Sequence, residues 1–363
     1  MDVRDGTMEA LGLDPAFWRG CRVFVTGHTG FKGAWLSFWL RELGAVVCGY
    51  SLAPETSPNL FSLLRLSESM DSRLGDVRQA DLLADAIAEF EPLVIVHLAA
   101  QALVRRGYAD PLHTFATNAM GTAGVLQAAR SCASVRSIVV ITSDKCYANE
   151  TAVGSPFNED DPLGGYDPYS ASKACAEIIT AAYRRSYFSQ STVVVASARA
   201  GNVIGGGDWS QDRLIPDVVR SVHAGLSVEL RNPDAIRPWQ HVFESLWGYL
   251  LLAQRGAAGD RSVAGAWNFG PDHGQSCSVS EVVELFGRAL ETTTGWYPVA
   301  LRDALHEAPA LLLDASKAQR ALGWKPRLST LQAVSLTAAW YRRFFKGDDV
   351  GELCREQLSA YVA

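Results

Sequence analysis

The sequence predicts an α/β protein built on a doubly wound parallel sheet, with a smaller α/β domain in its C-terminal half. Two observations support this fold class. Short, continuously apolar runs rich in β-branched residues alternate with helix-like segments up to about residue 202. Continuous rather than alternating apolar character indicates strands that are buried on both faces, and strands that alternate with helices are typical of parallel sheets.

The individual elements follow from apolar periodicity and from glycine and proline positions. Strands are expected at residues 23–26, 45–50, 93–98, 137–142 and 192–196. Helices are expected from the glycine turn after the first strand to about 43, and at 80–89, 111–132, 169–187, 216–225, 242–254, 280–290 and 330–345. We therefore expect a first domain at 18–202. Residues 203–363 would form mainly a second domain that closes over the carboxyl edge of the sheet, with some segments returning to the first.

Composition excludes several classes of protein. The 363 residues carry a net charge of −6, which argues against a general nucleic-acid binder. Seven scattered cysteines form no C-x-x-C pair, so neither a disulfide framework nor a zinc site is expected. The seven histidines are isolated, and no metal is implied. Without a signal-like N-terminus or a bilayer-length apolar stretch, we expect a cytoplasmic protein that does not enter membranes.

A glycine-rich loop follows the first predicted strand directly. It reads Thr26-Gly27-His28-Thr29-Gly30-Phe31-Lys32-Gly33, with the spacing G-x-x-G-x-x-G. Glycines between a buried strand and a helix allow a tight turn and let the backbone amides at the helix N-terminus approach a pyrophosphate. The loop predicts a Rossmann-like dinucleotide site with cofactor contacts at Gly27, Thr29, Gly30, Phe31, Lys32 and Gly33. We assign no firm physical role to Lys32.

The position that distinguishes NAD from NADP is uninformative. An NAD enzyme usually has an acidic residue at the end of the second strand, whereas here that strand ends Gly49-Tyr50-Ser51. No arginine stands there for a 2′-phosphate either. Asp76 is a candidate for contact with the adenine, although a solvated turn aspartate fits the sequence nearly as well.

Tyr169 and Lys173 provide the strongest catalytic signal. They lie four residues apart on a predicted helix and therefore on one face. A lysine charge beside the phenol is expected to lower the pKa of Tyr169. The tyrosine would then accept a hydroxyl proton while hydride passes to a nicotinamide.

A second polar cluster follows the strand predicted at 137–142. It reads Thr142-Ser143-Asp144-Lys145, and ligands of open α/β sheets bind just beyond the carboxyl ends of strands. A hydroxyl, an acid and an amine at this edge are suited to proton transfer. A capping or solvated loop is the alternative interpretation of these residues.

Longer segments resemble a known family. The glycine loop, the Y-x-x-x-K pair, His97-Leu98-Ala99-Ala100-Gln101 and Thr117-Asn118 look like extended short-chain dehydrogenase/reductases that act on nucleotide sugars. More narrowly, the chain from about Trp18 to Tyr341 resembles CDP-glucose 4,6-dehydratases. The segments that carry this resemblance are GHTGFKGAWLSFWL, TSDKCY, DPLGGYDPYSASKACAE, RAGNVIGGGDW, RLIPD and IRPWQHV.

The resemblance implies a redox-neutral dehydration with NAD. Tyr169 would deprotonate the C4 hydroxyl of the glucose, and Ser143 would hydrogen-bond the C4 oxygen. Asp144 would protonate the departing C6 hydroxyl. Most related dehydratases carry a glutamate as the C5 base where this chain has Lys145. The lysine is therefore either the base or a group that stabilises an enolate.

The resemblance also implies further ligand contacts. Additional cofactor contacts would come from Val77, Leu98, Ala99, Ala100, Gln101, Thr117, Thr142 and Arg199. Substrate contacts would come from Ser143, Asn202, Arg213, Leu214, Arg231, Arg237 and His306. A planar guanidinium suits diphosphate oxygens, although Arg231 also fits an ordinary surface position. The family usually dimerises through the helices expected at 111–132 and 169–187, so we expect a homodimer or a higher homo-oligomer.

Two other functions remain open at this level. A nucleotide-sugar 4-epimerase or 4-reductase needs Tyr169, Lys173 and a cofactor, but it needs no acid at Asp144. A catalytically silent NAD-binding scaffold would leave the spacing of Tyr169 and Lys173 without a purpose.

Overall fold

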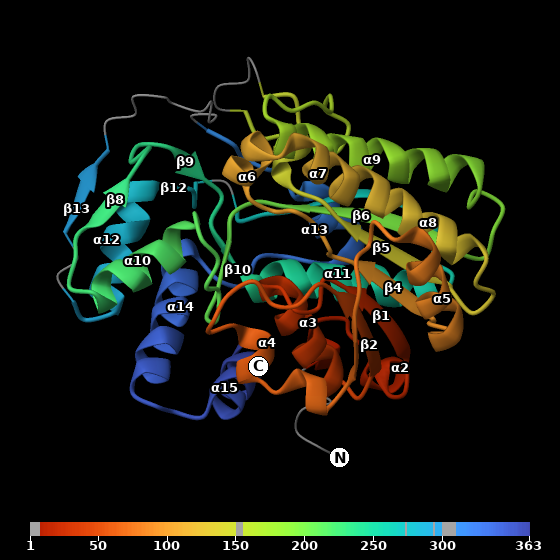
Figure 1. The fold of residues 1–363 in the computed structure, drawn as a ribbon, viewed down its shortest axis with the longest axis horizontal. Helices are drawn as coiled ribbons and strands as arrows, with labels where there is room; N and C mark the ends of the chain where they lie inside the picture. The colour runs from red at the N-terminus through yellow and green to blue at the C-terminus, as the bar shows by residue number, and fades with distance from the viewer. Residues whose placement is uncertain (1–7, 150–154, 273, 293–294, 300–309) are drawn as a thin grey trace.

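The computed structural model describes the chain except for residues 1–7, 150–154, 273, 293–294 and 300–309. At its centre lies a seven-stranded sheet with the order β11-β6-β5-β4-β1-β2-β3, in which each neighbouring pair is parallel (Figure 1). Its strands are β1 (Arg22–Thr26), β2 (Val46–Ser51), β3 (Asp71–Leu74), β4 (Val94–His97), β5 (Ser137–Ile141), β6 (Val194–Ala200) and β11 (Gly265–Phe269).

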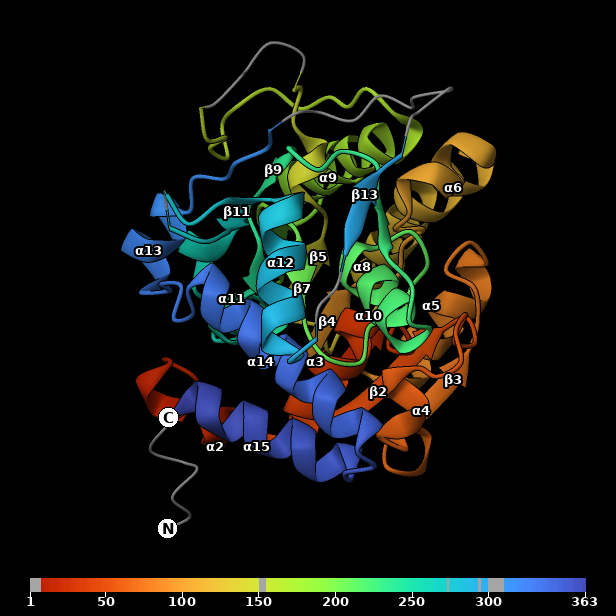
Figure 2. The same ribbon diagram turned by 90° about the vertical axis from the view of Figure 1, so that its left-hand side faces the viewer.

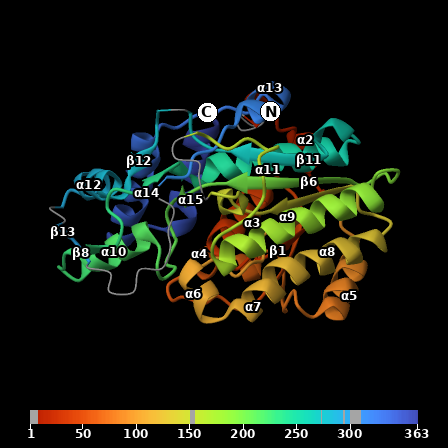
Figure 3. The same ribbon diagram turned by 90° about the horizontal axis from the view of Figure 1, so that it is seen from above.

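Helices cover both faces of this sheet, as Figure 3 shows. One layer contains α3 (Phe31–Glu42) and α11 (Val242–Ala257); the other contains α5 (Ala80–Phe90), α8 (Gly121–Arg130) and α9 (Pro168–Ser186). Successive strand residues point to opposite faces, so Val23 and Val25 join one hydrophobic cluster and Phe24 joins the other. Burial on both sides explains the continuous apolar runs of the sequence, and the predicted doubly wound fold is confirmed.

The helix predicted at 111–132 consists of three consecutive helical segments. These are α7 (Pro111–Phe115), a π-helical turn at Ala116–Met120, labelled η2, and α8. The strand predicted at 192–196 begins two residues later and continues to Ala200. Strands β3 and β11 were not predicted. β3 is short and polar, and Gly265 opens β11, so neither has the apolar pattern of the inner strands.

A second group of elements lies beside the carboxyl ends of the strands and faces the viewer in Figure 2. Its helices are α10 (Leu214–His223), α12 (Val279–Ala289) and α14 (Thr330–Phe345). They accompany three short strand pairs: β8 (Val228–Leu230) with β13 (Trp296–Pro298), β9 (Ile236–Arg237) with β12 (Cys277–Ser278), and β7 (Val203–Ile204) with β10 (Gln240–His241). The four helices predicted beyond residue 202 correspond to α10, α11, α12 and α14.

Parts of the second half return to the main sheet. Strand β11 pairs with β6 at the sheet edge, and α11 packs across β4, β5 and β6. The remaining helical segments are α2 (Pro15–Trp18), α4 (Leu60–Leu63), η1 (Leu66–Glu68), α6 (Val104–Ala109), η3 (Asp144–Cys146), η4 (Arg261–Val263), α13 (Ser316–Leu322) and α15 (Val350–Val362). Within the described residues, no helix has the length and apolar character required to cross a membrane.

Candidate active site

A cavity of about 1540 Å³ lies at the carboxyl ends of the strands, between the sheet and the second group of elements. It collects nearly all of the residues that the sequence predicts for binding and catalysis. Those in its wall are Gly27, Thr29, Gly30, Phe31, Lys32, Gly33, Asp76, Val77, Leu98, Ala99, Ala100, Gln101, Thr117, Thr142, Ser143, Asp144, Lys145, Tyr169, Lys173, Asn202, Arg213, Leu214, Arg231 and Arg237.

The glycine loop leaves no space for side chains at two positions. Gly27 has a φ of +76°, and a Cβ there would lie 2.7 Å from the backbone nitrogen of Ala99. A Cβ at Gly33 would lie 2.0 Å from the carbonyl oxygen of Gly27. Gly30 caps helix α3 without a side-chain hydrogen bond, so the first backbone N–H groups of the helix are available to an anion. This cradle fits the pyrophosphate of a dinucleotide.

Hydroxyl groups and an ion pair line the far end of the loop. The Thr29 hydroxyl lies 2.8 Å from that of Ser51 and donates to the carbonyl oxygen of Leu52 at 2.8 Å. Asp76 accepts hydrogen bonds from Arg78, which lower the pKa of its carboxyl. Asp76 lines the cavity while it holds this arginine, and its contact with adenine stays a prediction.

Asp144 lies in a 3₁₀ turn immediately after β5. Ser143 caps this turn by accepting the backbone N–H of Lys145 at 3.2 Å, and its hydroxyl donates to the Asp144 carboxylate at 2.9 Å. Burial raises the pKa of Asp144, although Lys145, Ser143 and Arg237 act in the opposite direction. A carboxyl group that retains its proton above the ordinary range is suited to act as an acid.

Helix α9 presents Tyr169 and Lys173 to the cavity from its first two turns. Asp167 caps the helix by accepting the N–H of Ser170 at 3.0 Å, and Pro168 fixes the first helical position. Both Tyr169 and Lys173 are buried. This arrangement places the phenol and the amine on the face of α9 that points to the cavity, as the four-residue spacing predicts.

The expected lowering of the Tyr169 pKa by Lys173 is wrong for the protein without ligands. Burial raises the pKa of Tyr169 to about 12, while a hydrogen bond with Ser143 and the charge of Arg213 act against this rise. The Lys173 ammonium instead donates to the carbonyl oxygen of Ile141 at 3.2 Å, and burial lowers the pKa of Lys173 to about 8. The cost of desolvating a phenolate therefore outweighs the nearby positive charges.

A buried hydrogen-bond network fixes the neighbouring loop. The Asn118 side chain accepts the N–H of Gln101 at 2.8 Å and donates to its carbonyl oxygen at 2.9 Å. It also donates to the Ser172 hydroxyl at 2.8 Å, which links the π-helical turn to helix α9. The network holds the cofactor-binding candidate Gln101 relative to the helix that carries Tyr169.

Three arginines reach the cavity from different segments of the second half. Arg213 precedes α10 and forms an ion pair with Asp208 at 3.0 Å. Arg231 pairs with Asp212 at 2.6 Å, and the buried Arg237 donates to the carbonyl oxygen of Ile236 at 2.9 Å. Their guanidinium groups line one cavity, where they can donate to the oxygens of a diphosphate.

Arg199 does not line the cavity, so the expected cofactor contact is wrong. Its guanidinium is buried outside the cavity wall. There it pairs with Glu177 at 2.9 Å and donates to the Tyr147 hydroxyl at 2.7 Å. Both members of this ion pair are 3% exposed. Arg199 therefore links strand β6 to helix α9 through a buried ion pair. His306, a substrate candidate, lies outside the described residues.

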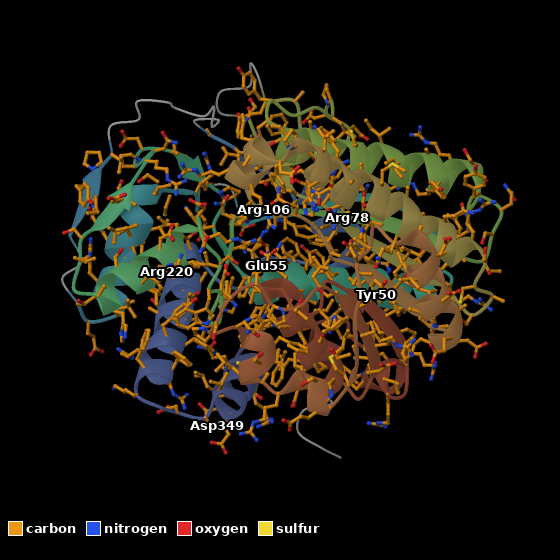
Figure 4. The ribbon with its side chains drawn as sticks, viewed as in Figure 1. Tyr50, Glu55, Arg78, Arg106, Arg220 and Asp349 are labelled. Atoms are coloured by element: carbon orange, nitrogen blue, oxygen red, sulfur yellow. The ribbon has the colours of Figure 1, made fainter. Side chains whose placement is uncertain are left out.

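The cavity also contains charged residues that the sequence did not identify. Arg106 of α6 forms an ion pair with Glu55 at 2.7 Å, and both side chains are labelled in Figure 4. The neighbouring Arg105 lies 3.5 Å from Asp212. These pairs connect α6 with the loops after β2 and before α10. No local pattern predicts them, because only the fold brings the three segments together.

Comparison with known proteins establishes the family. Residues 24–337 match the model of the GDP-mannose 4,6 dehydratase family. The chain belongs to this family. The resemblance to extended short-chain dehydrogenase/reductases that was drawn from the motifs is thereby confirmed.

Individual relatives of this GDP-mannose 4,6 dehydratase family member match between 88% and 97% of its length. The chain is 44% identical over 356 residues to a curated CDP-glucose 4,6-dehydratase from Salmonella typhimurium, covering 97% of this chain and 99% of that protein. It is 27% identical to a dTDP-glucose 4,6-dehydratase from Mycolicibacterium smegmatis, covering 88% and 93%. The solved DesIV structure, a dTDP-glucose 4,6-dehydratase from Streptomyces venezuelae with NAD bound, superimposes with a TM-score of 0.75 at 27% identity and covers 89% and 98%.

Proposed function

We propose that this protein is an NAD-dependent lyase that converts CDP-glucose into CDP-4-keto-6-deoxyglucose. The observation that carries the proposal is the position of Ser143, whose hydroxyl donates to Asp144 at 2.9 Å and lines the same cavity as Tyr169. An acid and a proton acceptor in one cavity suit a reaction that oxidises C4 and removes water across C5 and C6. The similarity to a CDP-glucose 4,6-dehydratase over 97% of the chain supports the same activity.

NAD fits the glycine cradle. The backbone approaches too closely for side chains at Gly27 and Gly33, and the open N-terminus of α3 suits the pyrophosphate. When bound, the nicotinamide supplies a hydride acceptor that later returns the hydride. Related dehydratase structures with NAD support this choice of cofactor over NADP.

The residues of the chain divide the proton transfers between them. Tyr169 accepts the C4 hydroxyl proton in its phenolate form, which is the minor form at neutral pH because burial raises its pKa to about 12. Ser143 hydrogen-bonds the C4 oxygen that becomes a carbonyl. The new carbonyl makes the C5 hydrogen acidic. Asp144 then gives its proton to the C6 hydroxyl, which leaves as water, and its raised pKa keeps that proton available.

The role of Lys145 stays as open as the sequence leaves it. Its half-buried side chain follows Asp144 directly and lines the same cavity. The lysine either removes the C5 proton or stabilises the enolate that forms after that proton has gone.

The substrate's diphosphate would contact the guanidinium groups of Arg213, Arg231 and Arg237, with Asn202 and Leu214 beside them. Asp208 and Asp212 hold Arg213 and Arg231 in position. In this proposal, residues 18–202 mainly bind the cofactor, and residues 203–363 mainly bind the nucleotide sugar.

The decisive experiment incubates the purified protein and NAD separately with glucose linked to CDP, dTDP, GDP and UDP. We expect CDP-glucose to give a 4-keto-6-deoxy product without net NADH, as measured by mass spectrometry and nucleotide absorbance. Formation of an epimerised hexose would instead establish the 4-epimerase alternative. Stoichiometric consumption or release of NADH would establish a reductase or a simple dehydrogenase.

We also propose that the protein forms a homodimer through the consecutive segments α7, η2 and α8 together with α9. Helices α8 and α9 lie side by side in Figure 3. Several large apolar side chains along this layer are exposed in the single chain, including Leu112 (82%), Met120 (65%) and Ile178 (56%). Large apolar side chains exposed along one helical layer are the kind of surface that a subunit interface covers.

The dimer proposal predicts the effect of Ile178→Asp. A buried carboxylate without a partner opposes association, so the variant should sediment as a monomer at concentrations at which the wild-type protein is a dimer. Leu226→Asp, at an exposed position after α10, serves as the control. A wild-type protein that sediments as a monomer would contradict the proposal.

We propose the cytoplasm as the location of the protein. All seven cysteines are free, and five of them are buried, which suits a reducing compartment.

A further inference from the structure

Glu177 is a buried carboxylate that has no part in the proton transfers proposed above. It lies on α9, is 3% exposed and is located outside the cavity wall. The Thr142 hydroxyl donates to one of its oxygens at 2.5 Å. The Ser197 hydroxyl and the Arg199 guanidinium donate to the other oxygen at 2.7 and 2.9 Å. The carboxylate therefore joins α9 to β6 and to the end of β5.

The two hydroxyl donors occupy different positions in the sheet. Ser197 lies within β6 and is paired with β5 on one side and with β11 on the other. Thr142 follows the last residue of β5, and the pairing of β4 with β5 ends earlier, at Val140. The N–H of Thr142 donates to the carbonyl oxygen of Ala198 at 2.9 Å, and its hydroxyl lies 3.5 Å from the same oxygen. The sheet thus holds Ser197 from two sides but Thr142 from one.

The end of β5 leads directly to the proposed acid. Asp144 follows Thr142 by two residues, in the turn that Ser143 caps. Its carboxylate lies against the backbone that follows β6, because a Cβ added at Gly201 would be 3.0 Å from Oδ2 of Asp144. A carboxyl group in such close surroundings can be displaced by a small movement of the strand end. The position of Asp144 therefore depends on the contacts that fix Thr142.

On the basis of the proposed function, we infer that Glu177 is a positioning residue for the loss of water. Through Thr142 it fixes the strand end that carries Asp144 relative to α9, the helix that carries Tyr169. Tyr169 itself is positioned by the cap at Asp167 and lies about two turns before Glu177. Oxidation at C4 should therefore proceed without the Thr142–Glu177 hydrogen bond, whereas elimination should depend on it.

Thr142→Val tests this separation, because it removes the hydroxyl and keeps the β-branched shape. In a single turnover with NAD and CDP-glucose, NADH absorbance appears when C4 is oxidised and disappears when hydride returns to C6 after water has left. We expect NADH to appear at the wild-type rate and to persist about 10–10²-fold longer, since a misplaced acid slows its own step. A loss of stability alone would lower Tm without prolonging the NADH signal.

Two further substitutions control for the hydroxyl and for the carboxylate. Thr142→Ser keeps a hydroxyl and should restore the wild-type lifetime of NADH. Ser197→Ala removes the other hydroxyl donor from Glu177 at a position that the sheet already fixes. It should lower Tm and leave the lifetime of NADH unchanged.

A double-mutant cycle assigns the effect to the bond between the two side chains. Glu177→Asp keeps the charge that pairs with Arg199 but shortens the side chain by one methylene, so it should also prolong the NADH signal. The double variant with Thr142→Val should show no further increase, because each change removes the same interaction. Multiplied effects in the double variant would mean that Thr142 and Glu177 act independently, which contradicts the inference.

The outcomes distinguish the two proposals. If the wild-type protein forms no 4-keto-6-deoxy product from CDP-glucose, the proposed function fails. If the wild-type protein forms this product and Thr142→Val keeps the wild-type lifetime of NADH, the inference about Glu177 is wrong. An equal increase in Ser197→Ala would also contradict it. Thr142→Ala lacks the same hydroxyl and decides the question if Thr142→Val does not fold.

Discussion

Asp144 combines burial with direct contact to a hydroxyl. Burial disfavours its charged form, so its proton is retained above the pH at which an exposed aspartate loses it. Exposure of Asp144 to solvent would remove the rise in its pKa. The acid therefore depends on the closed surroundings of the strand end as much as on its own chemistry.

Asp144→Asn removes the acidic proton and preserves the shape of the side chain. We expect oxidation at C4 to continue and loss of water to slow by about 10²–10⁴-fold. Reduced nicotinamide should therefore accumulate on the protein when CDP-glucose is added, as measured by its absorbance. Wild-type turnover by the variant would exclude Asp144 as the acid.

Lys145→Ala separates the two roles left open for this lysine. If Lys145 is the C5 base, the variant should lose exchange of the C5 hydrogen with deuterium from the solvent, as measured by mass spectrometry of the sugar. If exchange continues at the wild-type rate, Lys145 is not the base. The CDP-glucose incubation with the wild-type protein provides the reference.

At the residue scale, the sequence predicted which side chains gather but not how they interact. Tyr169, Lys173 and Asp144 were found because spacing and strand ends are visible in the chain. The raised pKa of Tyr169 was not, because it depends on burial by distant segments. The partner of Arg199 could not be predicted either. Only the packing of β6 against α9 shows that the guanidinium forms an ion pair with Glu177.

In the turn from β1 into α3, the backbone at Gly27 limits the space for a side chain at the start of the helix. At Gly33, an added Cβ would meet the carbonyl oxygen of Gly27 at 2.0 Å, whereas at Gly30 it would lie at 3.4 Å from the same oxygen. The two glycines flank the first helical turn of α3 and share the same loop. They therefore form a matched pair for substitution.

Gly33→Ala should lower the free energy of unfolding by about 1–3 kcal/mol, because the backbone must move to accept the methyl group. The same movement distorts the cradle, so NAD binding should weaken as well. Gly30→Ala should change both properties much less. Equal effects of the two substitutions, measured by chemical denaturation and calorimetry, would contradict this account.

At the element scale, long buried elements were predicted well because one periodic pattern runs through each of them. Helix α14 begins and ends where the sequence predicts. Short elements such as α4, α6 and β3 were not predicted, because these segments are too short to show a periodic pattern of apolar side chains. Strand β11 was not found because its place beside β6 depends on a chain reversal through α11.

Glu244 connects α11, which packs against the main sheet, with segments near the C-terminus. Its carboxylate lies in the first turn of α11 and accepts the backbone N–H groups of Arg327 and Leu328 at 3.0 and 2.8 Å. It also accepts the hydroxyl of Tyr361 at 3.1 Å. Burial raises the pKa of Glu244 from 4.5 to about 7. The folded protein therefore holds this proton more tightly than the unfolded chain does.

This proton makes stability depend on pH. The contribution is complete below the unfolded pKa and is lost as the pH rises through about 7, up to about 3 kcal/mol. Glu244→Gln should therefore show a smaller fall in Tm between about pH 5 and pH 8 than the wild-type protein. Glu9→Gln, at an exposed position, should match the wild-type slope. The same slope in Glu244→Gln would show that Glu244 stays ionised in the folded protein.

The edge of the sheet has a consequence for synthesis on the ribosome. Strand β6 ends at Ala200, but its outer neighbour β11 begins only at Gly265. Until that later stretch emerges, the nascent chain presents the backbone groups of β6 as an unpaired edge, which favours pairing with other chains. Translation stalled between these two strands would therefore release an aggregation-prone fragment, even though the glycine loop and both Tyr169 and Lys173 had already been made.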